Sequence, residues 1–199
     1  MTDLSSFLKE NSSDTLEIIF INDQLECKVN EISYKCDLSI SNIDKLINCL
    51  NTNLNTLVLQ FVTEKHSEYI DNNFKIPSTI KTIIFGAINL DQSYKFINNY
   101  TGEVCIFHYD PILENFIKSL ENTTSFKVYN TIEDEQHIEH LLSSLPNSVN
   151  RVMLNTFIES PRKLLELANI FTGEYIKHPY VDTVTFTRNT ILVKSAIKY

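Results

Sequence analysis

Apolar side chains recur along this chain with one repeated spacing. The stretch 76–90 shows the spacing most fully, with apolar residues at Ile80, Ile83, Phe85, Ile88 and Leu90. Related groups occur elsewhere: Leu54, Leu57, Leu59; Val149, Val152, Leu154; Val181, Val184, Phe186; and, in shorter form, Val104, Ile106 and Phe126, Val128. Because apolar and polar positions alternate within each group, we predict strands that are covered on one face and exposed on the other.

Helical patterns separate these groups. Apolar residues three and four positions apart predict helices over 41–51, 91–102, 110–120, 131–145 and 160–171, and the polar stretch 64–73 is also interpreted as helical. Ser41, Asp110 and Ser160 are the expected N-caps, and Gly102 is the expected end of the second helix of this series. The intervening strands are predicted over 57–61, 76–85, 104–109, 126–129, 149–154, 181–186 and 191–193. This alternation predicts an α/β fold with parallel strands.

The N-terminal region has a different pattern. Residues 16–21 are rich in types that favour strands, and residues 25–32 alternate between apolar and polar side chains. Asn22 and Asp23, between these two segments, are typical of a turn. We interpret 16–36 as an antiparallel hairpin that shields the first edge of the parallel sheet. The predicted organisation is an N-terminal β-hairpin cap over 1–40 and a strand–helix repeat solenoid over 41–199, in one compact domain.

The spacing of the strands distinguishes two α/β architectures. The anchors Leu57, Ile83, Val104, Phe126, Val152 and Val184 are separated by about 26, 21, 22, 26 and 32 residues. This spacing resembles that of leucine-rich repeats, which run over about 20–29 residues. A doubly wound sheet also alternates strands and helices, but no strand here ends in a glycine loop suited to a nucleotide. We therefore predict an irregular leucine-rich-repeat-like solenoid.

Two segments resemble each other and a known repeat. Residues 76–86 (Ile-Pro-Ser-Thr-Ile-Lys-Thr-Ile-Ile-Phe-Gly) and 145–154 (Leu-Pro-Asn-Ser-Val-Asn-Arg-Val-Met-Leu) are similar to the FNIP repeat, a relative of leucine-rich repeats with the approximate pattern [IL]-P-x-S-[IV]-K-x-L-x-[FL]-G followed by Asn. The second segment lacks the Lys and the Gly but keeps Pro146, Ser148 and Val149. The first segment has Thr79 in place of Ser and keeps Pro77, Ile80, Lys81, Phe85, Gly86 and Asn89.

The resemblance implies a role in protein interaction. FNIP repeats occur in slime-mould proteins and in large amoeba viruses, which implies an amoebal or viral source and, for a virus, the host cytoplasm. Some family members add an F-box, but the N-terminus here has no F-box pattern, so a ubiquitin-ligase adaptor is not expected.

Composition narrows the possible partners. The formal net charge of −8 disfavours nucleic acid and anionic membranes, since both require many basic residues. The chain shows no signal peptide and no run of apolar residues long enough to span a bilayer. Its four cysteines form no C-x-x-C pair, so we expect reduced thiols and a cytoplasmic location. With only 3 glycines, no phosphate-binding glycine loop is present, and no cofactor is predicted.

Candidate chemical groups are few. His137 and His140 have the spacing of two metal ligands on one helix, but no third ligand has an evident spacing, so we interpret them as part of a solvated acidic helix face. Cys105, His108 and Asp110 suggest a nucleophile system, but the cysteine and the histidine would point to opposite faces of a strand. We therefore predict no metal site, no catalytic residue and no enzyme.

The exposed face of the strands is the predicted binding surface. If the anchors point inward, their neighbours form outward ladders, one through Val58, Ile84, Cys105, Lys127, Met153 and Thr185 and a second through Gln60, Gly86, Phe107, Tyr129, Asn155 and Thr187. Aromatic residues, Met and Arg dominate binding energies at protein interfaces. The predicted partner-binding residues are Val58, Gln60, Ile84, Phe107, Lys127, Tyr129, Arg151, Met153 and Asn155.

Three functions remain open. The preferred one is a non-enzymatic module that binds a protein partner of unknown identity through the exposed strand face. The second is a self-assembling structural or decoy protein, in which a homo-oligomer covers that face. The third, less favoured, is a small enzyme on an open parallel sheet, which would require a pocket over Cys105, His108 and Asp110.

Overall fold

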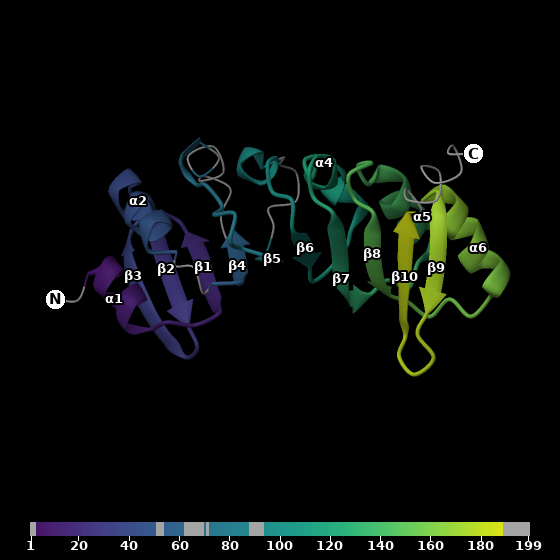
Figure 1. Cartoon of the computed structure of the whole chain (residues 1–199), viewed down its shortest axis with the longest axis horizontal. Helices are drawn as coiled ribbons and strands as arrows, with labels where there is room; N and C mark the ends of the chain where they lie inside the picture. The colour runs from purple at the N-terminus through teal and green to yellow at the C-terminus, as the bar shows by residue number, and fades with distance from the viewer. Residues whose placement is uncertain (1–2, 51–53, 62–69, 71, 88–93, 189–199) are drawn as a thin grey trace, which may run out of the picture.

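The computed structural model describes residues 3–50, 54–61, 70, 72–87 and 94–188. Its strands form one ten-stranded open sheet in the order β3-β2-β1-β4-β5-β6-β7-β8-β10-β9, which extends along the longest axis of the molecule (Figure 1). The strands are β1 (Thr15–Ile21), β2 (Gln24–Val29), β3 (Ile32–Asp37), β4 (Thr56–Phe61), β5 (Thr82–Ala87), β6 (Glu103–Ile106), β7 (Ser125–Thr131), β8 (Arg151–Asn155), β9 (Gly173–Lys177) and β10 (Thr183–Arg188).

Helices connect the strands, as the alternating pattern predicts. The described helices are α1 (Leu4–Glu10), α2 (Ile40–Cys49), the 3-10 helices η2 (Lys95–Ile97) and η3 (Pro111–Leu113), α4 (Glu114–Lys118), α5 (Glu135–Ser144) and α6 (Pro161–Ile170). Strands β1 and β4 to β8 are mutually parallel, whereas the pairs at both ends of the sheet are antiparallel. The fold is therefore α/β with a mostly parallel sheet.

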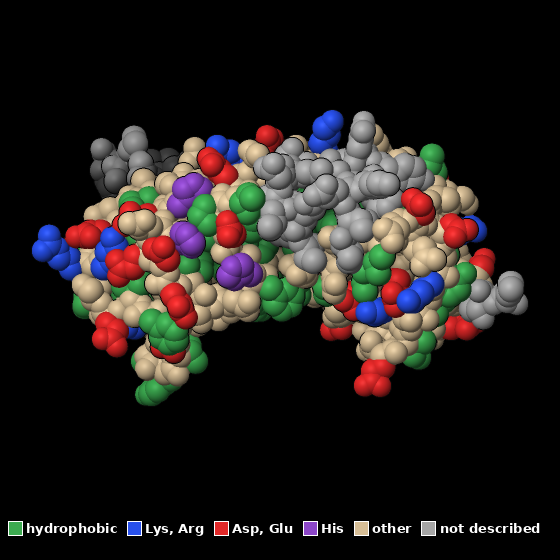
Figure 2. All heavy atoms as spheres, turned by 180° about the vertical axis from the view of Figure 1, so that it is seen from behind, with side chains coloured by type: hydrophobic (Ala, Val, Ile, Leu, Met, Phe, Trp, Pro, Cys, Tyr) green, Lys and Arg blue, Asp and Glu red, His purple; other side chains and the backbone are tan. Residues whose placement is uncertain are grey.

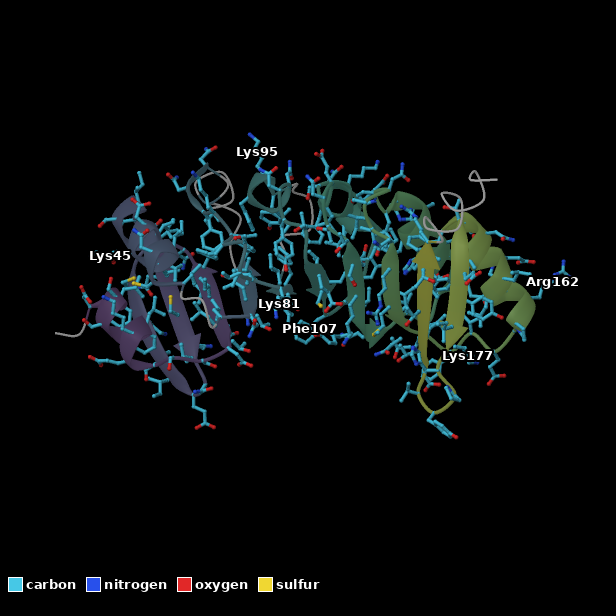
Figure 3. The ribbon with its side chains drawn as sticks, in the orientation of Figure 1. Lys45, Lys81, Lys95, Phe107, Arg162 and Lys177 are labelled. Atoms are coloured by element: carbon cyan, nitrogen blue, oxygen red, sulfur yellow. The ribbon has the colours of Figure 1, made fainter. Side chains whose placement is uncertain are left out.

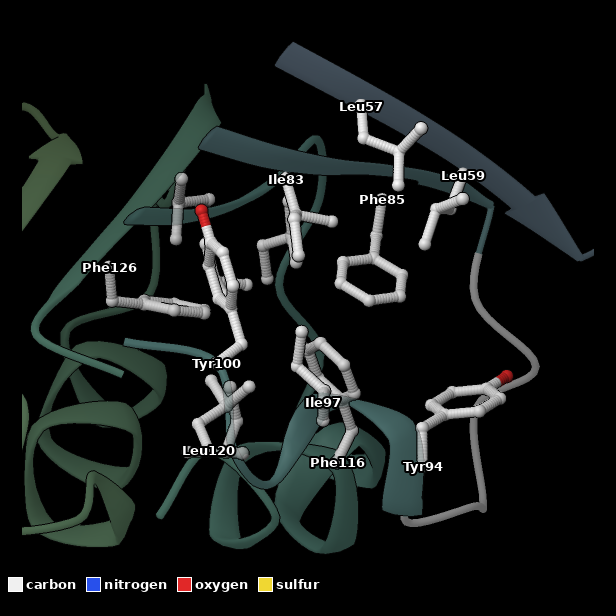
Figure 4. Packing of buried hydrophobic residues seen from close by; sticks show 14 of the residues in the cluster. Leu57, Leu59, Ile83, Phe85, Tyr94, Ile97, Tyr100, Phe116, Leu120 and Phe126 are labelled. Carbon is white, nitrogen blue, oxygen red and sulfur yellow. The ribbon is translucent and has the colours of Figure 1, made fainter. Parts of the chain in front are cut away.

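One face of the sheet forms the hydrophobic core. Figure 4 shows inward side chains of the strands opposite residues of the helical connections: Leu57, Leu59, Ile83, Phe85 and Phe126 face Tyr94, Ile97, Tyr100, Phe116 and Leu120. Phe85 and Phe116 meet edge to face with ring centroids 4.9 Å apart, a geometry that aromatic pairs prefer. All the predicted anchors from Leu57 to Val184 are fully buried here, because the strand period of two directs them to one side.

The N-terminal region differs from the predicted hairpin. It contains three antiparallel strands, and β1 also pairs in parallel with β4, so the region continues the main sheet. The second turn of this meander lies at Asn30, whose φ of 56° is left-handed. Asn tolerates that conformation better than most residues, which allows the chain to reverse between Val29 and Ile32.

Several helix starts differ from the prediction by a few residues. Ser39, not Ser41, caps α2 by accepting a hydrogen bond from the Asn42 amide. Asp134, not Thr131, caps α5, because its carboxylate accepts the Gln136 amide 2.8 Å away. The predicted caps of η3 and α6 are confirmed, since Asp110 accepts from Ile112 and Ser160 from Lys163.

The region predicted as a helix over 91–102 is described only from residue 94, where it contains the short 3-10 helix η2. Gly102 does not adopt the left-handed conformation of a helix-ending glycine. A Cβ at this position would lie 2.5 Å from the Lys81 carbonyl oxygen, so the residue is small because the neighbouring backbone is close.

The C-terminal strands also differ. The prediction missed β9, and it placed the last strand over 181–186, whereas β10 begins at Thr183 and lies antiparallel to β8. The strand predicted over 191–193 lies outside the described residues, as does most of the helix predicted over 64–73.

Candidate functional site

The face of the sheet opposite the core, here called the open face, carries the predicted binding residues. One row of side chains crosses it through strands β1 and β4 to β8 and ends on β10: Glu17, Val58, Ile84, Cys105, Lys127, Met153 and Thr185, each paired with the next. The predicted neighbours Val58, Ile84, Lys127 and Met153 are therefore adjacent in this order. None of them belongs to the core cluster of described residues.

The second predicted row is correct only in part. A register shift between Leu59 and Gln60 pairs Gln60 with Ala87 rather than with Gly86. A second register shift, between Val128 and Thr131, pairs Asn155 with Thr131 rather than with Tyr129. On its other side Asn155 pairs with Thr183 and not with Thr187, because β10 is antiparallel, a direction that the hydrophobic pattern does not encode. Arg151 lies at the opposite end of the open face from Asn155, next to Ser125 of β7.

Phe107, Tyr129 and Lys127 form the most distinctive group on the open face. The rings of Phe107 and Tyr129 are 5.3 Å apart, and the Lys127 ammonium lies 4.5 Å from the centre of the Tyr129 ring. Phe107 is 44% exposed, and it lies near the middle of the long axis (Figure 3). The Phe107 carbonyl accepts the Asn130 amide at 2.8 Å, which fixes the backbone beside the ring pair. This group, called the aromatic cluster below, exposes aromatic surface next to a cation.

Polar side chains behind the aromatic cluster are bonded to one another. The Ser125 hydroxyl donates to the Glu103 carboxylate at 3.1 Å, and the Cys105 thiol lies 3.6 Å from the other Glu103 oxygen. Burial, followed by the Glu103 charge, raises the pKa of the Cys105 thiol to about 12. Burial, followed by the proximity of Cys105, likewise raises the pKa of the Tyr129 hydroxyl to about 12. Both groups are neutral near pH 7, so Cys105 lacks the thiolate that a nucleophile needs.

Two of the predicted binding residues also hold the strands together. The Asn155 amide donates to the Tyr129 carbonyl, and its oxygen accepts the Thr183 hydroxyl at 2.8 Å. The Gln60 amide donates to the Glu17 carboxylate on the neighbouring strand. Since these amides are engaged within the sheet, the exposed residues Phe107 and Arg151 provide the more accessible contacts of the open face.

Charge differs between the open face and the helices. Lys127 and Arg151 are cationic, and neither forms an ion pair in the part of the chain that the structure describes. The α5 side is acidic, and Figure 2 shows acidic side chains and histidines gathered on the half of the molecule that carries α5. The open face thus carries the cations Lys127 and Arg151 beside the carboxylate of Glu103.

The histidines of α5 bind different partners. His140 Nδ1 lies 2.7 Å from the Tyr109 hydroxyl, and its Nε2 lies 3.8 Å from the Glu114 carboxylate. His137 lies 3.8 Å from Asp134 on its own helix. Among the described residues, no group of three or more His, Cys, Asp or Glu side chains is placed to hold a metal ion.

Cys105, His108 and Asp110, which were considered as a nucleophile system, lie in different environments. Cys105 is buried on the open face, and Asp110 is the N-cap of η3. His108 is exposed in the connection between β6 and η3, beyond the end of the strand. A cavity of about 420 Å³ lies elsewhere, beside residues 72–80 and 95–101, and the hydrophobic pattern gave no signal for it.

Comparison with known proteins does not assign the chain to a family. No protein-family model, no curated protein and no solved structure matches it. No helix within the described ranges is both long enough and apolar enough to cross a membrane. Function must therefore be inferred from the geometry of this chain alone.

Proposed function

We propose that the protein is a non-enzymatic binding module in which leucine-rich-repeat-like units present the open face to a protein partner. The parallel strands support the repeat architecture, because Leu57, Ile83, Val104, Phe126 and Val152 lie side by side although about 21–26 residues separate each from the next. Each strand with its following connection thus forms one unit that stacks on its neighbours.

A second regularity supports stacked repeats. The residue before each parallel strand accepts a hydrogen bond from the unit that follows it. Lys81 and Thr82 donate to the Asn55 carbonyl, Glu103 to Lys81, Thr124 to Gly102, and Asn150 to Thr124. Equivalent positions of successive units therefore bond to each other, as expected when one structural unit is repeated. The FNIP-like segments supply two of these positions, Lys81 and Asn150.

The aromatic cluster is the observation that carries the binding proposal. An exposed Phe ring, a partly buried Tyr ring and the Lys over it together provide apolar area, a hydrogen-bonding hydroxyl and positive charge, the features enriched at protein interfaces. We expect a partner that presents an apolar side chain flanked by carboxylates. Steering of acidic partners by Lys127 and Arg151 would be stronger at low salt.

The cytoplasm is the proposed location. The four cysteines Cys27, Cys36, Cys49 and Cys105 are all free, which suits a reducing compartment. A protein partner in the same compartment is therefore the most suitable target for an experiment.

Affinity capture from amoebal lysate tests the proposal. The bait is the intact chain, compared with a Phe107→Ala/Tyr129→Ala variant and with Ile112→Ala as a matched control. Ile112 is 49% exposed, similar to Phe107, but lies in η3 on the helical side. A captured protein is then purified, and its affinity for each variant is measured by calorimetry.

We expect the double variant to lose at least tenfold in affinity, or about 1.4 kcal/mol, because hot-spot aromatic residues typically contribute this much. The Ile112→Ala control should bind like the natural chain. A partner that binds the double variant undiminished but loses affinity for Ile112→Ala would move the site to the helices and contradict the proposal.

A further inference from the structure

A cavity of about 420 Å³ lies on the helical side of the sheet, away from the open face. Two connections enclose it, residues 72–80 before β5 and residues 95–101 before β6. Its volume falls within the range of small-molecule sites. Figure 3 places Lys95, one of its lining residues, and Phe107 on opposite margins of the molecule.

The lining of this cavity is cationic in an otherwise acidic protein. Lys75 and Lys95 border it, and no Asp or Glu is among its described lining residues. Neither lysine forms an ion pair with any residue in the described ranges. Among the described residues, no carboxylate pairs with these two ammonium groups from separate connections, so they favour an anion, and lysine is a common phosphate ligand.

The remaining lining residues divide into donors and an apolar floor. Hydroxyls and side-chain amides come from Ser78, Thr101, Asn72 and Asn99. Three buried aromatic residues, Phe74, Phe96 and Tyr100, also line the cavity and are called the aromatic floor below. Small-molecule sites usually combine apolar walls with a few polar groups. The hydroxyls and amides of this cavity can donate hydrogen bonds to phosphate oxygens.

The second FNIP-like segment has different neighbours from the first. There, the Arg188 guanidinium donates to the Pro146 carbonyl at 2.8 Å and lies 4.3 Å from the centre of the Phe171 ring. The backbone positions correspond, because Arg188 donates to Asn150 as Glu103 donates to Lys81. At the first segment, Tyr100 and Thr101 instead border an open cavity.

We propose that this cavity binds a small organic phosphate, with Lys75 and Lys95 holding the phosphate and the aromatic floor contacting the organic part. The site is independent of the open face, so its occupancy and partner binding can be tested separately.

Calorimetric titration of the intact chain with pyrophosphate and with ADP tests this proposal. A Lys75→Glu/Lys95→Glu variant reverses the charge of the site. A Lys9→Glu/Lys45→Glu variant changes the net charge equally at two exposed positions in α1 and α2. Thr101→Trp fills the cavity without changing any charge, and circular dichroism verifies the fold of each variant.

We expect one ADP per chain, bound more tightly than pyrophosphate. The charge reversal should weaken both by tenfold or more, the control variant should bind like the natural chain, and Thr101→Trp should weaken ADP. No saturable heat with either probe, or equal losses in the two charge variants, would overturn the proposal. Equal affinity for ADP and pyrophosphate would overturn the assignment of the organic part to the aromatic floor.

Discussion

Residues that alternate along one strand have different roles in this protein. On β7, Phe126 is fully buried in the core, whereas Tyr129 and Lys127 contribute to the open face. The sequence predicts this division well, because the side-chain period of a strand is two and its apolar positions mark the covered side. It does not predict that Cys105 is fully buried on the open face, since that depends on the neighbouring strands.

The two faces should respond differently to truncation. Phe126→Ala removes a fully buried ring, and we expect it to reduce the free energy of unfolding by about 3–5 kcal/mol. Phe107→Ala removes a ring that is 44% exposed, and we expect a loss of about 1 kcal/mol or less. Urea denaturation measures both. Equal losses would show that the open face is part of the core.

Stability should depend on the Cys105 thiol at alkaline pH. Its folded pKa of about 12 lies above its ordinary value of 9.0, so the folded state holds the proton more tightly than the unfolded state. The stabilisation is therefore complete below pH 9 and is lost as the pH rises toward 12. Cys105→Ala should reduce the slope of unfolding free energy against pH in this window. A slope identical to that of the natural chain would contradict the burial of this thiol.

At the scale of elements, the regular segments were predictable and the irregular ones were not. The parallel strands and α6 were predicted in outline because apolar periodicity and the Ser-Pro and Asp-Pro starts are local signals. The strand predicted over 76–85 was wrong at its start, since β5 begins at Thr82. Strand β9 was missed because Glu174 and Lys177 interrupt its short apolar pattern. The turn at Asn30 had a signal, an asparagine suited to left-handed backbone, but the alternation on both sides of it suggested one continuous strand.

The end of α6 contains a strained residue. Thr172 follows Phe171 with a φ of 57°, a conformation that is costly for a β-branched side chain. The next residue is Gly173, but a Cβ there would lie 2.0 Å from the Thr187 carbonyl oxygen, so this glycine permits the close pairing of β9 with β10 instead.

Substitutions at the end of α6 should distinguish the backbone strain at Thr172 from the close packing at Gly173. We expect Thr172→Gly to raise the free energy of unfolding by about 1 kcal/mol, because glycine adopts left-handed backbone without strain. Gly173→Ala should lower it by about 1–3 kcal/mol through overpacking against β10. Thermal denaturation of both variants checks this. Destabilisation by Thr172→Gly would show that the threonine side chain, which donates to the Phe171 carbonyl, outweighs the backbone strain.

At the scale of the whole molecule, one continuous sheet separates two candidate sites. The open face was predictable in outline, because side chains alternate along each strand and neighbouring parallel strands place equivalent residues in rows. The cavity bordered by Lys75 and Lys95 was not predictable, since it forms only where residues 72–80 meet residues 95–101, and the FNIP-like pattern that begins in the first segment does not encode this contact. The reversed direction of β10 was also not predictable, because it follows from the antiparallel pairing of β10 with the preceding strand β9, which the sequence prediction missed.

The most direct test of the central claim is site-specific photo-crosslinking in cells. A benzophenone side chain replaces Phe107 on the open face in one variant and Ile112 in η3 in the other. If the open face binds the partner, the variant at position 107 forms a crosslinked adduct with one protein and the variant at position 112 does not. An adduct from position 112 with none from position 107 would contradict binding through the open face.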